Sequence, residues 1–460
     1  MRKSCLLALL MLFSNAPFAM LSLDAVMHSA KIHYPKIILA KQKIAEKEQA
    51  LLKSQGQFDP SLYNSVKLNP QGGYENRYDR LRLTLPVEKT PLTLFGQYRI
   101  GQGQWPEYFK NYLTNSNGEA LIGFELPLIK DLLIDERRGS IATKRYQVQL
   151  AKYETFQTEI NTLQQAGFVY WYWVLEVNKR HFAKKLLDLA KERQFALKRR
   201  KQLGDSPDID LVENKRFILK RKENLVHADL KVKQAALSLS LYYRNSLGQP
   251  IVPKANQAPR FRFINQSLRK PNRQAIIAEV FAVNPALRIL DKLKQITQID
   301  IDLAKNKLLP TLNASLSTKK QYGQDGDPLL KRTNLFAGLT FNFPLYQRDA
   351  KGSYGIAVNK YSQLTIQENY LSQQLHVTLE KILSEQQADQ HRLALINKEV
   401  ALAKKIERAE RIRFNAGDSS LFLVNQREQT TFSLEILACQ IMTEFKLALL
   451  QLEALKGFLK

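Results

Sequence analysis

The sequence has few of the residues that build disulfide frameworks, metal centres or catalytic sites. Its 460 residues include two cysteines and six histidines. Two cysteines cannot form a disulfide framework or a cysteine-rich metal site, and no zinc-type spacing joins the histidines. Nucleophile elbows and phosphate-binding loops are missing, and paired carboxylates occur only in helical patterns. We therefore expect no enzymatic activity, no metal and no cofactor.

Long apolar runs and acidic residues are also scarce. After the N-terminus no apolar stretch approaches the roughly 20 residues that a membrane-spanning helix needs, and the mean hydropathy is −0.32. Asp and Glu number 43 against 69 Lys and Arg, which gives a formal net charge of +26. An excess of this size favours polyanionic neighbours such as nucleic acid, anionic lipid or anionic envelope polymers.

The first 19 residues have the layout of a secretory signal peptide. Arg2 and Lys3 form a basic start, an apolar run covers 6–13, and small residues follow up to Ala19. This pattern predicts export, although Pro17 leaves the cleavage site open. A buried N-terminal core helix is the alternative. Export disfavours nucleic acid as the partner that explains the charge.

The chain contains an internal duplication. The residues of 124–128 resemble those of 341–345, and a Gly-Asp-Ser triplet occurs at Gly204 and again at Gly417. A Gly-Ser pair precedes each triplet by the same distance, at 139 and at 352. Matched intervals in the same order predict two copies of one large unit. We expect a signal peptide at 1–19, a first repeat at 20–247, a linker at 248–271 and a second repeat at 272–460.

Each repeat is predicted to end in a long helical hairpin. Over 375–403 apolar residues recur at spacings of four and three, which is the pattern of a coiled-coil seam. The segment 141–203 is also free of proline and rich in Lys, Glu, Gln, Leu and Ala. Each rod turns at a Gly-Asp-Ser triplet and a second helix returns, so the hairpins cover 135–245 and 350–457.

Strands are predicted ahead of each long helix. Residues 334–343 alternate apolar with polar side chains, with Phe336 as the exception, and 311–318 and 120–126 alternate similarly. Strands of this length with one apolar and one polar face suit a transmembrane β-barrel. A soluble sheet with one buried face is the alternative. We expect strands within 58–128 and 308–345, and a helix over 273–307.

In this order the segments resemble the TolC-like outer-membrane efflux protein family, over essentially the whole mature chain. The resemblance implies a mixed α+β fold: a homotrimer closes one transmembrane β-barrel, which a long periplasmic α-helical barrel continues. Trimerisation would remove the open edges of each sheet. The matching stretches are Gln57–Leu62, Lys307–Leu312, Asn284–Arg288, Ala166 with Tyr170 and Trp171, Arg199–Gly204, and Arg413–Gly417.

The first repeat departs from the family pattern. The interval from Pro60 to Pro127 is about twice as long as that from Pro310 to Pro344. Its additional residues include two alternating segments within 80–100. These form either a long extracellular hairpin or two further barrel strands, so the number of strands in each protomer stays open.

The resemblance implies a passive exit channel of a tripartite efflux pump, located in the outer membrane and extending into the periplasm. Its partners would be two further copies of the chain, a periplasmic adaptor (membrane fusion protein), an inner-membrane pump and outer-membrane lipid, and not nucleic acid. The exit duct of a type I protein-secretion system is the alternative. A periplasmic coiled coil that never inserts and a secreted polyanion-binding protein are the other candidates.

The acidic candidate residues lie at the helix tips, where the resemblance places the periplasmic entrance. Asp210 would line the closed entrance, with Asp205 and Glu213 nearby, and three copies would form an acidic ring that favours cations. The alternative for Asp205 and Asp418 is capping of helix N-termini. Lysine and arginine crowd 179–233, and we expect most of them to form a solvated face; contact with anionic envelope polymers is the alternative.

The second tip differs from the family, because Leu423 and Gln426 stand where acidic entrance residues often occur. Its entrance would close through an apolar constriction at Leu421, Phe422 and Leu423, unless these side chains pack in the helix seam. The small residues of both tips are the predicted contacts to the adaptor: Gly204, Ser206, Gly417 and Ser419.

Overall fold

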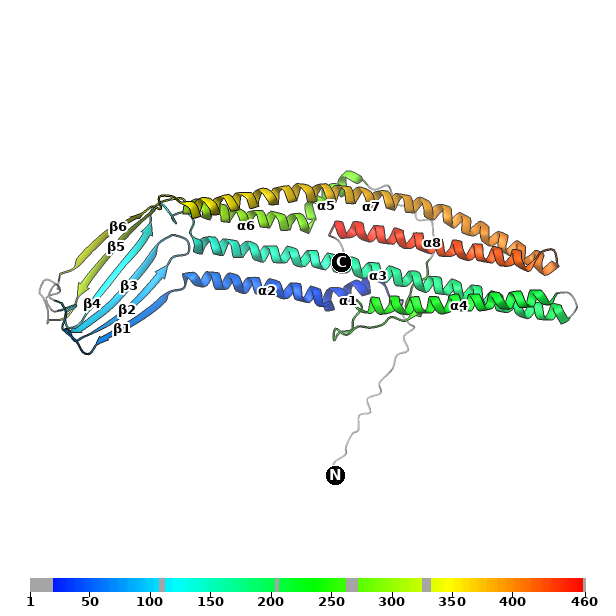
Figure 1. The fold of residues 1–460 in the computed structure, drawn as a ribbon, viewed down its shortest axis with the longest axis horizontal. Coiled ribbons are helices and arrows are strands. Elements are labelled where there is room, and N and C mark those ends of the chain that lie inside the picture. Colours follow the sequence, from blue (N-terminus) through cyan, green and yellow to red (C-terminus); the bar gives the residue numbers. More distant parts are fainter. Residues whose placement is uncertain (1–19, 107–111, 203–206, 262–271, 325–331, 458–460) are drawn as a thin grey trace, which may run out of the picture. The chain divides into compact units, whose positions relative to one another are not determined.

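The computed structural model describes residues 20–106, 112–202, 207–261, 272–324 and 332–457 (Figure 1). Its elements run in the order helices, strands, long helix and returning helix, and this order occurs twice along the chain. The chain divides into two compact units. The sheet unit comprises Ala40–Thr155 and Pro285–Ser372, and the helical unit comprises the described residues of Met1–Leu39, Phe156–Asn284 and Gln373–Lys460.

The sheet unit contains one sheet of six strands, which follow one another in chain order. Every neighbouring pair is antiparallel, and the pairing of β4 with β5 joins the two halves of the chain. The alternating segments predicted from the sequence are strands. Their bounds are β1 (Ser61–Asn69), β2 (Asn76–Pro86), β3 (Thr93–Gly103), β4 (Glu119–Pro127), β5 (Thr311–Gln321) and β6 (Asn334–Asn342).

The additional segments of the first half are strands within this sheet. β2 pairs with β3 from Asn76 opposite Gly103 to Pro86 opposite Thr93, and β1 and β4 flank the pair. Of the two predicted alternatives, the structure therefore has two further strands. They also extend beyond the predicted bounds of 80–100.

Close packing in the middle of the sheet requires a glycine on β4. A Cβ atom added to Gly123 would lie 2.6 Å from the Cβ of Ser317 and 2.7 Å from the Cζ of Phe95. The backbone carbonyl oxygen of Leu316 is also 2.7 Å away, and it cannot move without disturbing β5. Gly123 therefore allows the ring of Phe95 to lie across the strand.

Two prolines divide the helices that precede the strands. The helix predicted over 273–307 is two helices, α5 (Arg273–Val283) and α6 (Pro285–Lys307), separated at Asn284. Proline lacks an amide hydrogen and clashes with the preceding turn, so it begins a helix and does not continue one. Proline also begins α2 (Pro35–Gln55), which follows α1 (Leu23–His33).

Two very long helices follow the strands, α3 (Glu136–Gln202) and α7 (Arg348–Ala416). In the sheet unit, α2 is fixed to the beginning of α3 by polar contacts. The Ser54 and Ser140 hydroxyls are 2.8 Å apart, and the Thr155 hydroxyl donates to the Ala40 carbonyl at 3.0 Å.

The helical unit is built from the ends of α3 and α7 and the returning helices α4 (Asp208–Ser240) and α8 (Leu421–Leu455). Within this unit the helices lie side by side in the order α7, α8, α3 and α4 (Figure 1). One apolar cluster packs α7 on α8, and another packs α3 on both α4 and α8. The outer helices of this layer are therefore α4 and α7.

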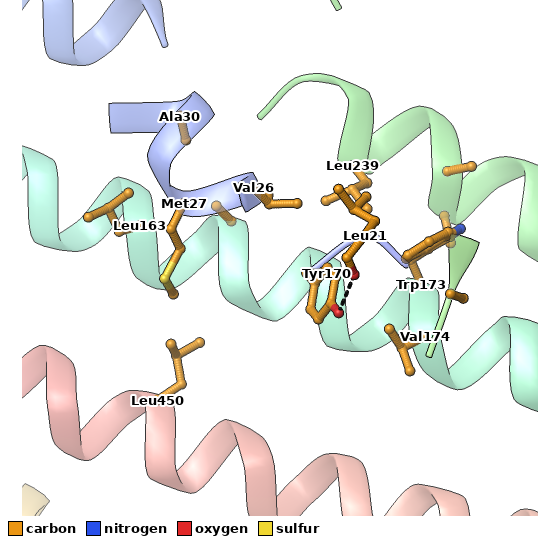
Figure 2. Packing of buried hydrophobic residues seen from close by; sticks show 14 of the residues in the cluster. Leu21, Val26, Met27, Ala30, Leu163, Tyr170, Trp173, Val174, Leu239 and Leu450 are labelled. Carbon is orange, nitrogen blue, oxygen red and sulfur yellow. Dashed lines mark hydrogen bonds between the residues drawn. The ribbon is translucent and has the colours of Figure 1, made fainter. Parts of the chain in front are cut away.

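The largest apolar cluster surrounds the aromatic segment of α3 (Figure 2). Trp173 is fully buried, and the Tyr170 hydroxyl donates to the Leu21 carbonyl at 2.8 Å. Burial raises the pKa of Tyr170 to about 12. The linker reaches the same region, because the Leu21 amide donates to the carbonyl of Gln257 at 2.9 Å. The N-terminal segment, the linker and α3 thus share one core.

The predicted seam of α7 is confirmed. Its apolar positions at spacings of four and three are buried from Leu375 to Val400, and so is Asp389, whereas Ala403 at the end of the predicted seam is half-buried. Burial of this stripe against α8 and α5 stabilises this part of the helix. The buried seam residues are Leu375, Leu379, Ile382, Asp389, Leu393, Ile396 and Val400.

Candidate functional site

One face of the sheet is apolar and exposed. The strand pairing places Leu62, Leu83 and Ile122 on the same face, and the other members follow at every second residue. These side chains are between 37% and 72% exposed. The face consists mainly of Leu62, Val66, Leu68, Leu81, Leu83, Leu94, Ile122, Leu316, Leu335, Leu339 and Phe341.

The opposite face is polar and carries charges. Arg80, Arg99, Glu119 and Gln321 follow one another across four neighbouring strands in register. Glu119 is only 1% exposed. It forms an ion pair with Arg99, and the Lys319 ammonium and the Gln321 amide lie 3.4 and 3.2 Å from its carboxylate. This separation of apolar from polar residues is what a sheet between lipid and water requires.

Both edges of the sheet are open. β1 pairs only with β2, and β6 pairs only with β5, within the described part of the chain. An open edge presents unpaired backbone amides and carbonyls, which invite another strand. Further copies of the chain could satisfy both edges.

Each of the two outer helices of the helical unit has a stripe of exposed apolar residues. On α4 these residues recur at intervals close to seven, as in a coiled-coil seam that lacks its partner helix. Two different stripes on one chain can join copies in a closed ring. They comprise Ile209, Val212, Leu219, Val226, Leu230 and Leu237 on α4, and Val377, Leu395, Leu402, Ile406 and Ile412 on α7.

The turn at the second helix tip uses a glycine and a serine cap. Gly417 has a φ of 91°, a conformation that favours glycine. The Ser420 side chain accepts a hydrogen bond from the Leu423 amide and caps α8. Capping by Asp418, one of the predicted alternatives, is therefore wrong. Asp418 and Ser419 complete the turn after Gly417, so the exposed Asp418 lies two residues before the N-cap position of α8.

The three apolar residues that follow the cap of α8 differ in how far they are buried. Leu421 is 3% exposed and packs with Leu197, Phe414 and Val424. In one chain Leu421 therefore packs in the helix seam, which is one of the two predicted alternatives. Phe422 is 61% exposed and Leu423 is half-buried. Their role at an entrance stays a prediction.

The first tip is described only in part. Gly204, Asp205 and Ser206 lie outside the described residues. Asp210 and Glu213 are half-buried in the first turns of α4. Their role at an entrance stays a prediction. At the second tip, the Ser419 hydroxyl donates to the Glu410 carboxylate at 2.6 Å.

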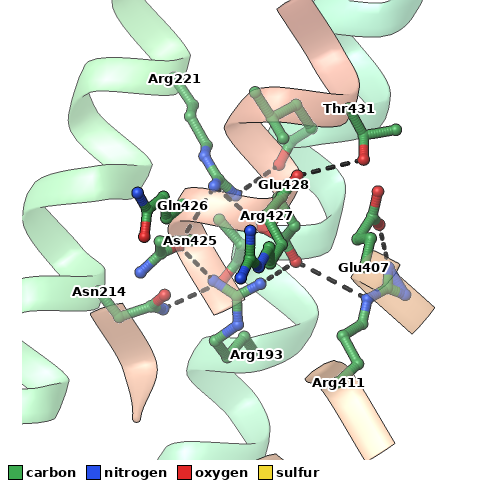
Figure 3. Close-up of polar contacts among 12 residues, drawn as sticks. Arg193, Asn214, Arg221, Glu407, Arg411, Asn425, Gln426, Arg427, Glu428 and Thr431 are labelled. Carbon is green, nitrogen blue, oxygen red and sulfur yellow. Dashed lines mark hydrogen bonds and ion pairs between the residues drawn. The ribbon is translucent and has the colours of Figure 1, made fainter. Parts of the chain in front are cut away.

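A buried ionic cluster behind the tips joins the two helical hairpins (Figure 3). Glu428 on α8 is 1% exposed. Its carboxylate forms ion pairs with Arg193 of α3 and Arg221 of α4. Arg221 lies 2.9 Å from its carboxylate, and Asn425 accepts from Arg193 at 2.6 Å and from Arg221 at 3.2 Å. The cluster therefore connects three helices through one carboxylate.

Both arginines of this cluster are deeply buried. Arg193 is 8% and Arg221 is 4% exposed. Burial lowers the pKa of Arg221, and the nearby Glu428 carboxylate opposes this effect. Arg221 also donates to the Leu186 carbonyl at 2.9 Å, and Arg411 lies 3.8 Å from Glu428. The two guanidinium groups thus depend on hydrogen bonds and a single central carboxylate.

The expected solvated face over 179–233 is wrong for these arginines. A count of charges cannot reveal this cluster, because it does not separate charged residues in the seam from those on the surface. Arg193 stands three residues after the buried Ala190 and four before the buried Leu197. Glu428 likewise stands seven residues after Leu421. A charged residue at a seam position, among apolar residues spaced by three and four, was the feature of the sequence that could have predicted a buried ion pair.

Two absences hold over the described residues. No helix there is both long and apolar enough to cross a bilayer. No three His, Cys, Asp or Glu side chains of those ranges gather closely enough to hold a metal ion.

Solved structures of outer-membrane channels share this fold. The CmeC outer membrane channel of Campylobacter jejuni is 12% identical, with a TM-score of 0.66 over 95% of this chain and 85% of that one. The open state of the MtrE outer membrane channel of Neisseria gonorrhoeae is 13% identical, with a TM-score of 0.67 over 96% and 91%. The outer membrane protein VceC of Vibrio cholerae is 13% identical, with a TM-score of 0.65 over 95% and 97%.

A scan against protein-family models finds no match, and a search of curated proteins finds no relative by sequence. At this level of identity the structural likeness concerns the fold. The predicted resemblance to TolC-like channels is thereby confirmed for the fold, over nearly the whole chain.

Proposed function

We propose that the chain forms a passive exit channel in the outer membrane, as a homotrimer that extends into the periplasm and serves a tripartite efflux pump. The solved structures with this fold are described as outer-membrane channels. Their fold supports the same assignment here. Neither an enzymatic activity nor a cofactor is part of the proposal.

The observation that carries the proposal is the two-faced sheet. Its apolar face contains leucines that are up to 72% exposed, and no described element covers it. Soluble proteins rarely expose a contiguous apolar patch of this kind. A soluble sheet would bury this face in a core, whereas a barrel turns it toward lipid and its polar face toward water. The uncovered face therefore favours the barrel.

Assembly into a closed ring follows from the open edges. One copy of the sheet has six strands and two unpaired edges, and bilayer lipid cannot satisfy an open edge. If three copies join β6 to β1, the barrel has 18 strands. The exposed stripes on α4 and α7 would be buried in the same ring. The number three rests on the likeness to the family.

The helix tips are the proposed contact with a periplasmic adaptor and the proposed entrance. Gly417 and Ser419, together with Gly204 and Ser206, supply small residues against which helices pack closely. The proposed entrance residues are Asp205, Asp210, Glu213, Asp418, Phe422 and Leu423. The buried cluster around Glu428 supports this assignment, because it holds the two hairpins together directly behind these residues.

Dye efflux and protein secretion, measured in cells that lack the protein, test the proposed function and its alternatives. We expect these cells to accumulate a fluorescent dye that cells with the protein expel, while the set of proteins secreted into the medium stays the same. An unchanged dye level together with the loss of a secreted protein would favour the type I secretion duct. Release of the protein from membranes by a carbonate wash would favour a coiled coil that never inserts.

A further inference from the structure

The polar face of the sheet carries an excess of positive charge. The strand register places five cations and two carboxylates on this face. Three of the cations lie on β2 and β3, the strands that only the first half of the chain has. We call the five cations the basic belt: Lys67, Arg80, Arg82, Arg99 and Lys319.

The carboxylates of this face do not balance the basic belt. Glu119 is shared between Arg99 and Lys319, so it is already surrounded by more positive charge than it carries. Glu125 lies at the opposite end of β4. Within the described ranges, neither Arg80 nor Arg82 forms an ion pair with a carboxylate. Positive charge is therefore left over.

Aromatic rings hold these two arginines on the face. The Arg82 guanidinium lies 4.8 Å from the centre of the Phe95 ring, and that of Arg80 lies 5.7 Å from the Tyr63 ring. A ring under the guanidinium orients it and leaves its N–H groups available to a ligand. The Nε of Arg80 is shielded from solvent, and no described group accepts a hydrogen bond from it.

The arrangement is unfavourable for the sheet alone. Arg80 stands directly opposite Arg99 in the pairing of β2 with β3, and like charges at directly opposite positions destabilise a sheet. On the apolar face the charges of β2 are instead of opposite sign, since Arg77 and Asp79 form an ion pair at 2.8 Å. Proteins tend to break such local rules at functional sites.

We propose that the basic belt is an anion-binding zone in the lumen of the channel and that the exported substrates are anionic. The inference rests on the proposed function, because only a closed barrel makes the polar face a lumen. Each copy contributes the same cations, so closure places them around one water-filled passage. Low-dielectric walls concentrate the field of such charges and attract anions from solution.

Block of single channels by a multivalent anion tests the proposal. Purified protein is inserted into planar lipid bilayers, and inositol hexakisphosphate is added on each side in turn. We expect it to block the current. In the Arg80→Gln/Arg82→Gln double variant the half-blocking concentration should rise about tenfold, since each copy loses two attracting charges. Higher salt should weaken the block in the wild type.

Neighbouring lysines on β5 provide a matched control. Lys319→Gln removes a charge from the polar face and should also weaken the block. Lys320→Gln removes the same charge from the opposite face and should leave the block unchanged.

Equal block in the wild type and the double variant would overturn the anion-binding zone, provided that both conduct. Equal effects of Lys319→Gln and Lys320→Gln would overturn it as well. A wild-type protein that inserts and never conducts would instead refute the proposed channel. If the double variant fails to conduct, Arg82→Gln alone gives the comparison.

Discussion

The replacement Glu428→Gln removes the carboxylate that the buried Arg193 and Arg221 share. Gln keeps the shape and one acceptor oxygen but leaves two buried guanidinium groups without a full counter-charge. Breaking a buried ion pair from one side costs about 3–5 kcal/mol. Protection of the α8 amides from hydrogen exchange should therefore fall by roughly two to three and a half powers of ten.

A second carboxylate on the same helix serves as the control for this measurement. Glu444 pairs with Arg392 at 2.7 Å, but its side chain is 51% exposed, and exposed pairs contribute about 0–1 kcal/mol. Glu444→Gln should thus change protection by less than about tenfold. If Glu428→Gln had no greater effect than Glu444→Gln, the cluster would not hold the hairpins together. Replacing the two arginines and Glu428 by Met together should restore most of the stability.

Three further perturbations have defined outcomes. Leu339→Lys places a charge on the lipid-facing side at a cost of about 2–4 kcal/mol per copy; it should reduce the membrane-inserted fraction, whereas Thr340→Lys on the other face should not. Burial raises the pKa of Asp389 above its ordinary value of 3.8, so its charged form destabilises the fold. Asp389→Asn should have the higher free energy of unfolding at pH 7, and this advantage should disappear below pH 3.8. Burial raises the pKa of Cys439 to about 12, so maleimide at pH 7 should label it only after unfolding; a second adduct in the unfolded protein would show that Cys5 is retained.

The elements that depend on a repeating pattern could be predicted from the sequence. The strands alternate because each has one apolar face, and the register confirms the expected sides for β4, β5 and β6. The seam of α7 is visible because burial against α8 requires apolar residues at spacings of four and three. Each of these patterns repeats within one strand or helix, so it can be recognised in a single sequence without knowledge of the partner elements.

Features that depend on distant partners could not be found in this way. Whether 80–100 formed a separate hairpin or joined the sheet depends on the pairing of β1 with β2 and of β3 with β4. The cap of α8 depends on how many residues the turn at Gly417 uses. The cluster around Glu428 brings together residues more than 200 positions apart, and a charge count treats each of them as exposed.

The mass of the protein in detergent tests the central claim most directly. Light scattering, corrected for bound detergent, should give a particle of about three chain masses that is extracted from membranes only with detergent. That result is expected if open edges of one sheet close against further copies. Single chains or dimers that stay in solution without detergent would contradict the closed barrel and, with it, the channel.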